Sequence, residues 1–272
     1  MSHPRISVFA GSATGNALAT RTIEGQKTLQ ARTNHQLGVD SVHDEIVAPN
    51  PFAQAILFFR GGANGEEAPL RIIQGPKTKL VYLDNIAVDG PHGEVVAAQT
   101  LTDSILVFSR EQSGDVSPIR IISGPKTKLD HPWKASVDPV NNLIAVTAKN
   151  RILVFNRTDN GDVAPKWVIE GPKLRAMTPR VLTPVLYPGG KKIFVSMRVK
   201  KGVGTAIGVW KYGDTGDVEP WATIKSSPTT RLTTLTNGGM AINSEGKEVM
   251  TLAGEVYGSE RILIFRAPEL FQ

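Results

Sequence analysis

A basic, hydroxyl-bearing phrase recurs in this sequence, and its residues have the chemistry needed to bind an anion. Exact or varied copies stand at Lys27-Thr28, Lys77-Thr78-Lys79, Lys126-Thr127-Lys128, Lys173-Leu174-Arg175 and Thr229-Thr230-Arg231. Lysines and arginines that converge in a concave site focus positive potential and attract anions. From these loops and their neighbours we predict the ligand-binding residues Lys79, Lys128, His131, Trp133, Lys134, Arg175, Arg180 and Arg231. The competing interpretation is that the phrase is only loop sequence copied with a repeat. Solvent-exposed lysines beside a strand carry no penalty in folding free energy, so they need no ligand to explain them.

Two further patterns could hold a cation. His35 and His131 fall in loops of this same type, but two histidines without a defined third ligand make a weak zinc site. The acidic stretches from Asp159 to Asp162 and from Asp214 to Asp217 offer oxygen ligands for calcium. Gly-Asp and Asn-Gly are also what a tight turn requires, and we favour the turn interpretation for both.

These loops are positioned by a repeat. Ile-Leu-Val-Phe stands at Ile105–Phe108 and Ile152–Phe155, and looser copies end in the aromatics Phe9, Phe59, Trp210 and Phe265. The closing aromatics lie 47 to 55 residues apart, which marks a repeat architecture. One repeat contains four short apolar runs, at 85–89, 94–99, 104–108 and 118–122, separated by turn residues. Four short antiparallel strands per repeat predict an all-β fold, a β-propeller, with residues 1–272 forming a single domain.

The number of strands of each kind bears on how the ring closes. The first, second and fourth strands of the repeat each occur five times, whereas the third occurs six times. Five blades are favoured, and six blades with one incomplete or shared are the alternative. We expect the ring to close by pairing of an N-terminal strand with the C-terminal blade, which hides otherwise exposed edges. The surplus strand at Arg5–Phe9 could be a stub, an extra edge strand or a link to a second copy in a homo-oligomer.

The stretch from Asp84 to Asp89, with Ser104–Phe108 and Pro118–Gly124, resembles the NHL and SMP-30-like group of propellers. The resemblance covers nearly the whole chain. Members of this group include lactonases, lyases, synthases and pure binding scaffolds, and the fold alone does not decide which function this chain has. Lactonases of this kind hold a divalent metal in the channel with Glu, Asn and Asp. The nearest candidates here are Asn85, Asn142 and Asn237, with Asp84, so calcium or zinc in the channel is the cofactor that this resemblance implies. None of them stands in a motif specific enough to transfer the family's ligands.

The connecting loops differ in charge. Loops that follow the fourth strand are basic, and loops that follow the third strand carry Gly-Glu or Gly-Asp, as at Gly114-Asp115. We expect one basic, hydroxyl-rich face and one acidic face. The favoured function is therefore a non-catalytic binding scaffold with a small anionic ligand or a protein on the basic face. A metal-dependent lactonase-like hydrolase and an assembly module that uses unpaired edge strands are the alternatives.

Composition narrows these classes. The 272 residues carry a net charge of +6, and the four tryptophans and four tyrosines are not interleaved with a dense basic stripe, which argues against nucleic acid. The absence of cysteine excludes thiol chemistry and disulfides. No apolar run has the roughly 18 residues of a membrane helix, and Met-Ser-His-Pro-Arg lacks a signal core. We expect a soluble protein, either cytoplasmic or the mature form of a secreted one.

Overall fold

The computed structural model describes residues 4–31, 36–83, 85–178, 180–198, 205–230, 232, 239–253 and 261–272. The chain divides into two compact units, one of Met1–Ala97 with Val107–Ile119 and the other of Ala98–Leu106 with Arg120–Gln272. The single domain expected over residues 1–272 stays a prediction. Among the described residues, none of the helices has the length and apolar character needed to cross a bilayer.

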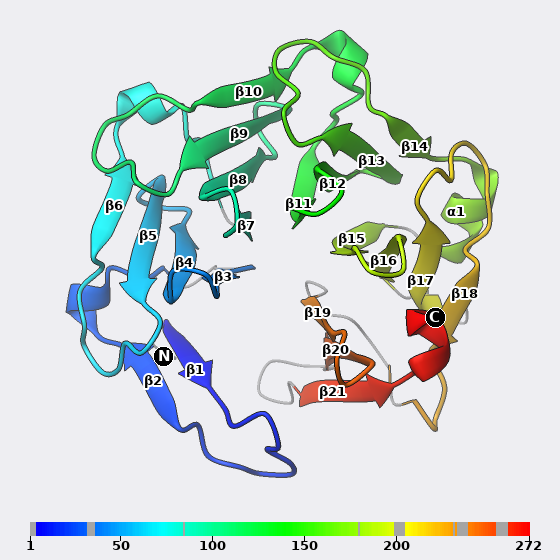
Figure 1. The fold of residues 1–272 in the computed structure, drawn as a ribbon, viewed down its shortest axis with the longest axis horizontal. Helices are drawn as coiled ribbons and strands as arrows, with labels where there is room; N and C mark the ends of the chain where they lie inside the picture. The colour runs from blue at the N-terminus through cyan, green and yellow to red at the C-terminus, as the bar shows by residue number, and fades with distance from the viewer. Residues whose placement is uncertain are drawn as a thin grey trace. The chain divides into compact units, whose positions relative to one another are not determined.

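The fold is an all-β propeller with five blades, as predicted (Figure 1). In the described residues, four blades are four-stranded antiparallel sheets whose strands follow chain order. They are β3 Gly38–Asp40, β4 Glu45–Asn50, β5 Ala55–Arg60 and β6 Arg71–Gln74; β7 Ile86–Asp89, β8 Glu94–Gln99, β9 Ser104–Ser109 and β10 Arg120–Ser123; β11 Pro132–Asp138, β12 Leu143–Ala148, β13 Arg151–Asn156 and β14 Trp167–Ile169; and β15 Val181–Tyr187, β16 Lys192–Met197, β17 Thr205–Lys211 and β18 Ala222–Lys225. The fifth blade has three described strands, β19 Met240–Asn243, β20 Glu248–Ala253 and β21 Arg261–Arg266.

The recurring Ile-Leu-Val-Phe phrase is the third strand of a blade, and its closing aromatic is core in four copies. Phe59, Phe108, Phe155 and Trp210 are fully buried, whereas Phe265, which was also predicted to be core, is half-buried and Phe9 is 42% exposed. In the larger unit, Ile152 and Val154 of β13 pack against Ile193 and Val195 of β16, so one sheet face covers the next. Within that unit the first strand β11 also contacts β15, and β15 contacts β19.

The surplus strand forms a small sheet of its own. β1 (Arg5–Val8) pairs antiparallel with β2 (Arg21–Glu24), with Ile6 opposite Ile23. Both isoleucines are buried against Ile46 and Leu57 of the β3–β6 sheet. The prediction of an extra third-type strand is therefore confirmed, while closure of the ring between the chain's ends stays a prediction.

The basic loops are more ordered than the sequence suggested. Three of them form 3-10 turns, η1 Gln26–Thr28, η2 Pro76–Thr78 and η3 Pro125–Thr127, and the fourth forms the short helix α1 Pro172–Met177. The hydroxyls of Thr78 and Thr127 donate to the carbonyls of Gly75 and Gly124, each at 2.6 Å, and both threonines are buried. The prediction of a hydroxyl-rich surface is wrong for these threonines, because their hydroxyls donate hydrogen bonds to carbonyl groups within the turns. A last 3-10 turn, η4 Pro268–Phe271, buries Leu270 and Phe271.

The acidic turns join the basic turns instead of occupying a separate face. Asp115 Oδ1 accepts a hydrogen bond from the Lys77 N–H at 2.7 Å, and Gly114 N–H donates to the Ile72 carbonyl at 2.7 Å. Equivalent bonds run from Lys27 to Glu66, from Lys126 to Asp162 and from Lys173 to Asp217. The predicted separation of basic and acidic loops is therefore wrong, because each acidic turn ties the next repeat to the basic turn before it.

The acidic stretches considered for calcium are tight turns. Asp159 accepts from the Asn156 N–H, and Asp214 accepts from the Lys211 N–H, each at 2.9 Å. With Asp162 and Asp217 engaged as described, these carboxylates cap backbone N–H groups. The turn interpretation is confirmed.

Candidate functional site

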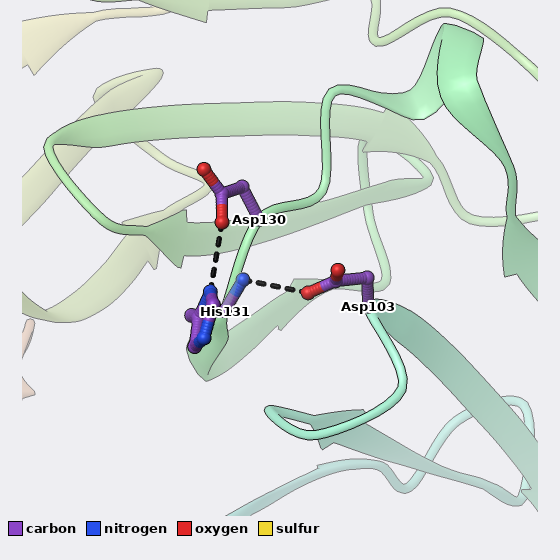
Figure 2. A group of neighbouring side chains, drawn as sticks. All are labelled: Asp103, Asp130 and His131. Atoms are coloured by element: carbon purple, nitrogen blue, oxygen red, sulfur yellow. Dashed lines mark hydrogen bonds and ion pairs between the residues drawn. The ribbon is translucent and has the colours of Figure 1, made fainter.

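His131 lies between two carboxylates in the larger unit, and these three residues form the candidate site (Figure 2). The residue follows η3 and immediately precedes β11. Its ring Nδ1 contacts Asp130 Oδ1 at 2.8 Å, and its backbone N–H donates to Asp103 Oδ1 at 2.7 Å. Asp103 comes from the turn between β8 and β9, so two loops that are distant in sequence meet here.

A lysine forms an ion pair with one carboxylate of this group. Lys149 Nζ lies 2.5 Å from Asp130 Oδ2 and comes from the turn between β12 and β13. The hydrogen bonds from Lys149 and then from His131 hold the pKa of Asp130 below its ordinary value, because both stabilise the ionised carboxylate. The carboxylate therefore stays charged at neutral pH and fixes the imidazole ring of His131.

This group offers one of two chemistries. Its ligand atoms, one from each residue, all lie within 4.8 Å of one another, and imidazole with two carboxylates is a donor set that suits zinc and similar ions. Alternatively the two carboxylates and Lys149 only orient His131 on an exposed loop. His131 was predicted from the sequence, whereas Asp103 and Asp130 were not. Asp103 lies in a loop between a second and a third strand, and the propeller pattern places such loops on the same face as the loop that carries His131.

A cation stacked on an aromatic ring lies two residues along the chain. The guanidinium carbon of Arg180 is 4.3 Å from the centroid of the Trp133 ring, and both side chains are half-buried. Such a contact fixes a mobile arginine against a rigid surface. Both residues were predicted ligand contacts, and the structure brings these two into contact with each other.

The other predicted ligand residues have different surroundings. Lys128 is exposed and binds Glu170 at 3.1 Å, where Arg151 is also bound at 2.7 Å. Hydrogen bonds from Arg151 and then Lys128 lower the pKa of Glu170. Arg175 is exposed in α1, and Lys79 is exposed in the equivalent loop of the other unit. Lys134 is 0% exposed within β11, so its ammonium is not on the loop surface, and Arg231 lies outside the described residues.

The metal candidates implied by the family resemblance do not share one structural position. Asn85 is buried just before the first strand β7. Asn142 lies in the turn after the first strand β11, where its Oδ1 accepts a hydrogen bond from Arg157 Nε at 3.0 Å. Asn237 and Asp84 lie outside the described residues. The two described asparagines thus stand at opposite ends of a first strand in their respective blades.

One buried ionic group was missed by the sequence reading. In the smaller unit, Arg71 forms two hydrogen bonds of 2.6 Å to the Glu45 carboxylate, and Arg110 adds a third at 3.0 Å. Burial acts to raise the pKa of Glu45, but the bonds from Arg71 and then Arg110 outweigh it, so the pKa is lowered. These residues join the β3–β6 sheet to the turn that follows β9.

Comparisons with known proteins show the fold. A hydrazine synthase chain of Kuenenia stuttgartiensis superposes with a TM-score of 0.59 at 13% identity, covering 82% of this chain and 56% of that one. A chain in a crystal structure of a mitotic checkpoint complex gives 0.61 at 14% identity, covering 92% and 65%. This chain therefore spans less than two thirds of either. No family model and no curated protein matches the sequence. At these identities the likeness supports a β-propeller and assigns no activity.

Proposed function

We propose that this propeller is a non-catalytic binding scaffold that binds a small anion or an acidic protein through exposed basic loop residues. The Trp133–Arg180 stack carries the proposal, because it holds a guanidinium in a fixed orientation against an aromatic ring. A planar guanidinium can bind a carboxylate or phosphate with two parallel hydrogen bonds. Exposed Lys128 and Arg175 add positive charge in the same unit.

Charge reversal tests this proposal. We expect a fluorescein-labelled poly-glutamate peptide to bind the wild-type protein, and Lys128→Glu with Arg175→Glu to abolish binding without changing the melting temperature. The control reverses two exposed lysines elsewhere, Lys166→Glu with Lys247→Glu, for the same change in net charge. Binding should weaken with salt, as exposed charges are screened. Equal binding by wild type and the Lys128/Arg175 variant would contradict the proposal.

The motifs around Asp84–Asp89 also lead us to place this scaffold in the NHL and SMP-30-like group. The alternative function within that group is a metal-dependent hydrolase of the lactonase kind. The observation in its favour is the Asp103–Asp130–His131 group, which is a better donor set than the asparagines named above. Elemental analysis of the purified protein decides between them, because the hydrolase requires a stoichiometric divalent metal. A metal that is lost in His131→Ala would favour the hydrolase.

An assembly module remains the third candidate, and one edge strand favours it. Ile262 and Ile264 of β21 are 55% and 47% exposed, whereas the equivalent Ile152 and Val154 of β13 are fully buried. Exposed apolar edge strands invite pairing with another chain, and the surplus strand predicted at Arg5–Phe9 is the partner that we propose in a homo-oligomer. Light scattering over a concentration series should then show a larger species that Ile262→Lys removes. A monomer at every concentration would contradict this candidate.

A further inference from the structure

Three lysines surround a surface pocket of the β15–β18 sheet, remote in sequence from the candidate site described above. The pocket has a volume of about 350 Å³, and its lining includes Lys191, Lys192, Lys211, Tyr212 and Trp221. These residues come from the turn before β16, the first residue of β16, the end of β17 and the approach to β18. The pocket is therefore built from consecutive strands of one blade.

Two of the lysines are placed directly opposite one another. Lys192 and Lys211 are a cross-strand pair in the β16–β17 ladder. Like charges directly opposite each other destabilise a sheet. At the same position, two other blades have pairs of opposite charge, Glu45 with Arg60 and Glu248 with Arg266. The lysine pair is thus a costly exception to the repeat.

The inner lysine is buried and held in place. Lys192 is 4% exposed, and its Nζ donates to the carbonyl oxygen of Leu270 at 3.1 Å and to that of Gln272. The same nitrogen lies 4.2 Å from the centroid of the Trp221 ring, and Lys211 Nζ lies 5.7 Å from it. Burial and then the charge of Lys211 lower the pKa of Lys192. Trp221 therefore gathers two ammonium groups on one aromatic ring.

No side-chain carboxylate lines this pocket among the residues that the structure describes. Asp214 accepts from the Lys211 backbone, Asp138 accepts from the Tyr212 hydroxyl at 2.7 Å, and Glu219 lines the neighbouring pocket that shares Trp221. Lys192 is held by main-chain oxygens of Leu270 and Gln272, and Gln272 also lines the pocket. Lys191 and Lys211 therefore supply the positive charge that favours an anion, and lysines bind phosphate groups as point charges.

We propose that this pocket binds a phosphate- or sulfate-type oxyanion, with Lys191 and Lys211 contacting it from the rim and Lys192 from the base. The site is separate from the loops of the proposed function and does not depend on them. An oxyanion there would relieve the repulsion between Lys192 and Lys211. This accounts for a lysine at position 192, where the second strands of the other blades begin with a glutamate or a leucine.

Lys211→Glu separates a binding role from a structural one. It converts the pair into one of opposite charge, so we expect a higher melting temperature together with at least a tenfold weaker affinity for inorganic phosphate and for sulfate. Lys225→Glu is the control, since Lys225 ends β18 and lines the neighbouring pocket on Trp221. Affinity is measured by titration calorimetry at constant ionic strength, with chloride as the balancing ion.

The control variant should retain wild-type affinity for both anions. Three results would overturn the proposal: no phosphate or sulfate binding by the wild type at millimolar concentration, unchanged binding by Lys211→Glu, or an equal loss in Lys225→Glu. The last result would show a general effect of net charge. Lys128→Glu with Arg175→Glu should leave this affinity unchanged, so failure here and failure of the proposed function are distinguishable.

Discussion

The second strands of two blades begin with opposite charges and keep them by different means. Glu45 starts β4 and is neutralised by Arg71 and Arg110, whereas Lys192 starts β16 and binds only backbone carbonyls. Both side chains are buried. The difference teaches that this repeat position tolerates a charge of either sign, provided that another part of the blade supplies hydrogen bonds.

The two solutions differ in what remains when one partner is lost. Removal of Glu45 would leave the guanidinium of Arg71 without this carboxylate partner, and the Arg71 side chain is only 17% exposed. Arg110 would keep its ion pairs with Asp40 and Glu111. Removal of Lys192 would leave the main-chain oxygens of Leu270 and Gln272 and the face of the Trp221 ring without their ammonium partner. We therefore expect unequal costs at two equivalent positions.

The largest effect should follow Glu45→Ala. Breaking a buried ion pair by removing one partner costs about 3–5 kcal/mol, because the remaining charge stays desolvated. The free energy of unfolding, measured by urea denaturation, should fall accordingly. Glu67→Ala is the control, since it removes an exposed partner of Arg60 and should change little. Equal stability of the two variants would show that the Glu45 cluster adds nothing.

The turns that follow the two blades offer a second contrast. β6 is followed by Gly75, which has φ 134° and ψ 170°, and a Cβ there would lie 2.5 Å from Asp115 Oδ1. The segment after β18 begins with Ser226 and does not contain the Gly-Pro-Lys-Thr sequence. Only glycine adopts the Gly75 conformation without strain, so Gly75→Ala should cost about 1–3 kcal/mol. Ser226→Ala should leave the melting temperature nearly unchanged, and a similar loss in both would refute the contrast.

The strands of this fold were predictable because their signal is local. The run at 104–108 corresponds to β9 at Ser104–Ser109, and hydrophobic residues bounded by turn residues were enough to find it. The tie between Lys77 and Asp115 was not predictable in this way, since its partners lie 38 residues apart in different repeats. The charge of each loop was predicted correctly, but the position of an acidic turn beside a basic turn depends on this hydrogen bond.

The candidate site shows the same limit. His131 was identified from its loop, whereas Asp103, which bonds its backbone, lies 28 residues earlier. Nothing near Asp103 marks it as a partner, because a single aspartate in a turn most often caps that turn. Lys134 illustrates the opposite error, since a lysine in a predicted surface loop looked accessible and is buried in β11.

Lys192→Met should have a smaller effect than Glu45→Ala. The variant loses charged hydrogen bonds to the Leu270 and Gln272 carbonyls, which destabilises the fold. It also removes a buried ammonium and its repulsion with Lys211, which stabilises it. We expect a net change of about 1 kcal/mol or less in the free energy of unfolding. A loss as large as that of Glu45→Ala would mean that the two positions are held equally tightly.

The smallest expected effect is a difference in how the two charges respond to pH. The pKa of Glu45 is below its ordinary 4.5, so its folded state favours the carboxylate, and this stabilisation is present above pH 4.5 and is lost as the pH falls through the folded value. The pKa of Lys192 is below its ordinary 10.5, so its folded state disfavours the ammonium. That penalty is complete at neutral pH and is relieved as the pH rises from the folded value towards 10.5.

These signs can be measured as differences between matched proteins. The free energy of unfolding of the wild type, relative to that of Glu45→Gln, should decrease as the pH falls from 6 to 3. The free energy of unfolding of the wild type, relative to that of Lys192→Met, should increase as the pH rises from 8 to 10.5. Each change should be smaller than the loss expected for Glu45→Ala, and its sign is what the measurement tests. If acid instead widened the first difference, Glu45 would be protonated more readily in the folded state, and the two arginines would not be its counter-charges.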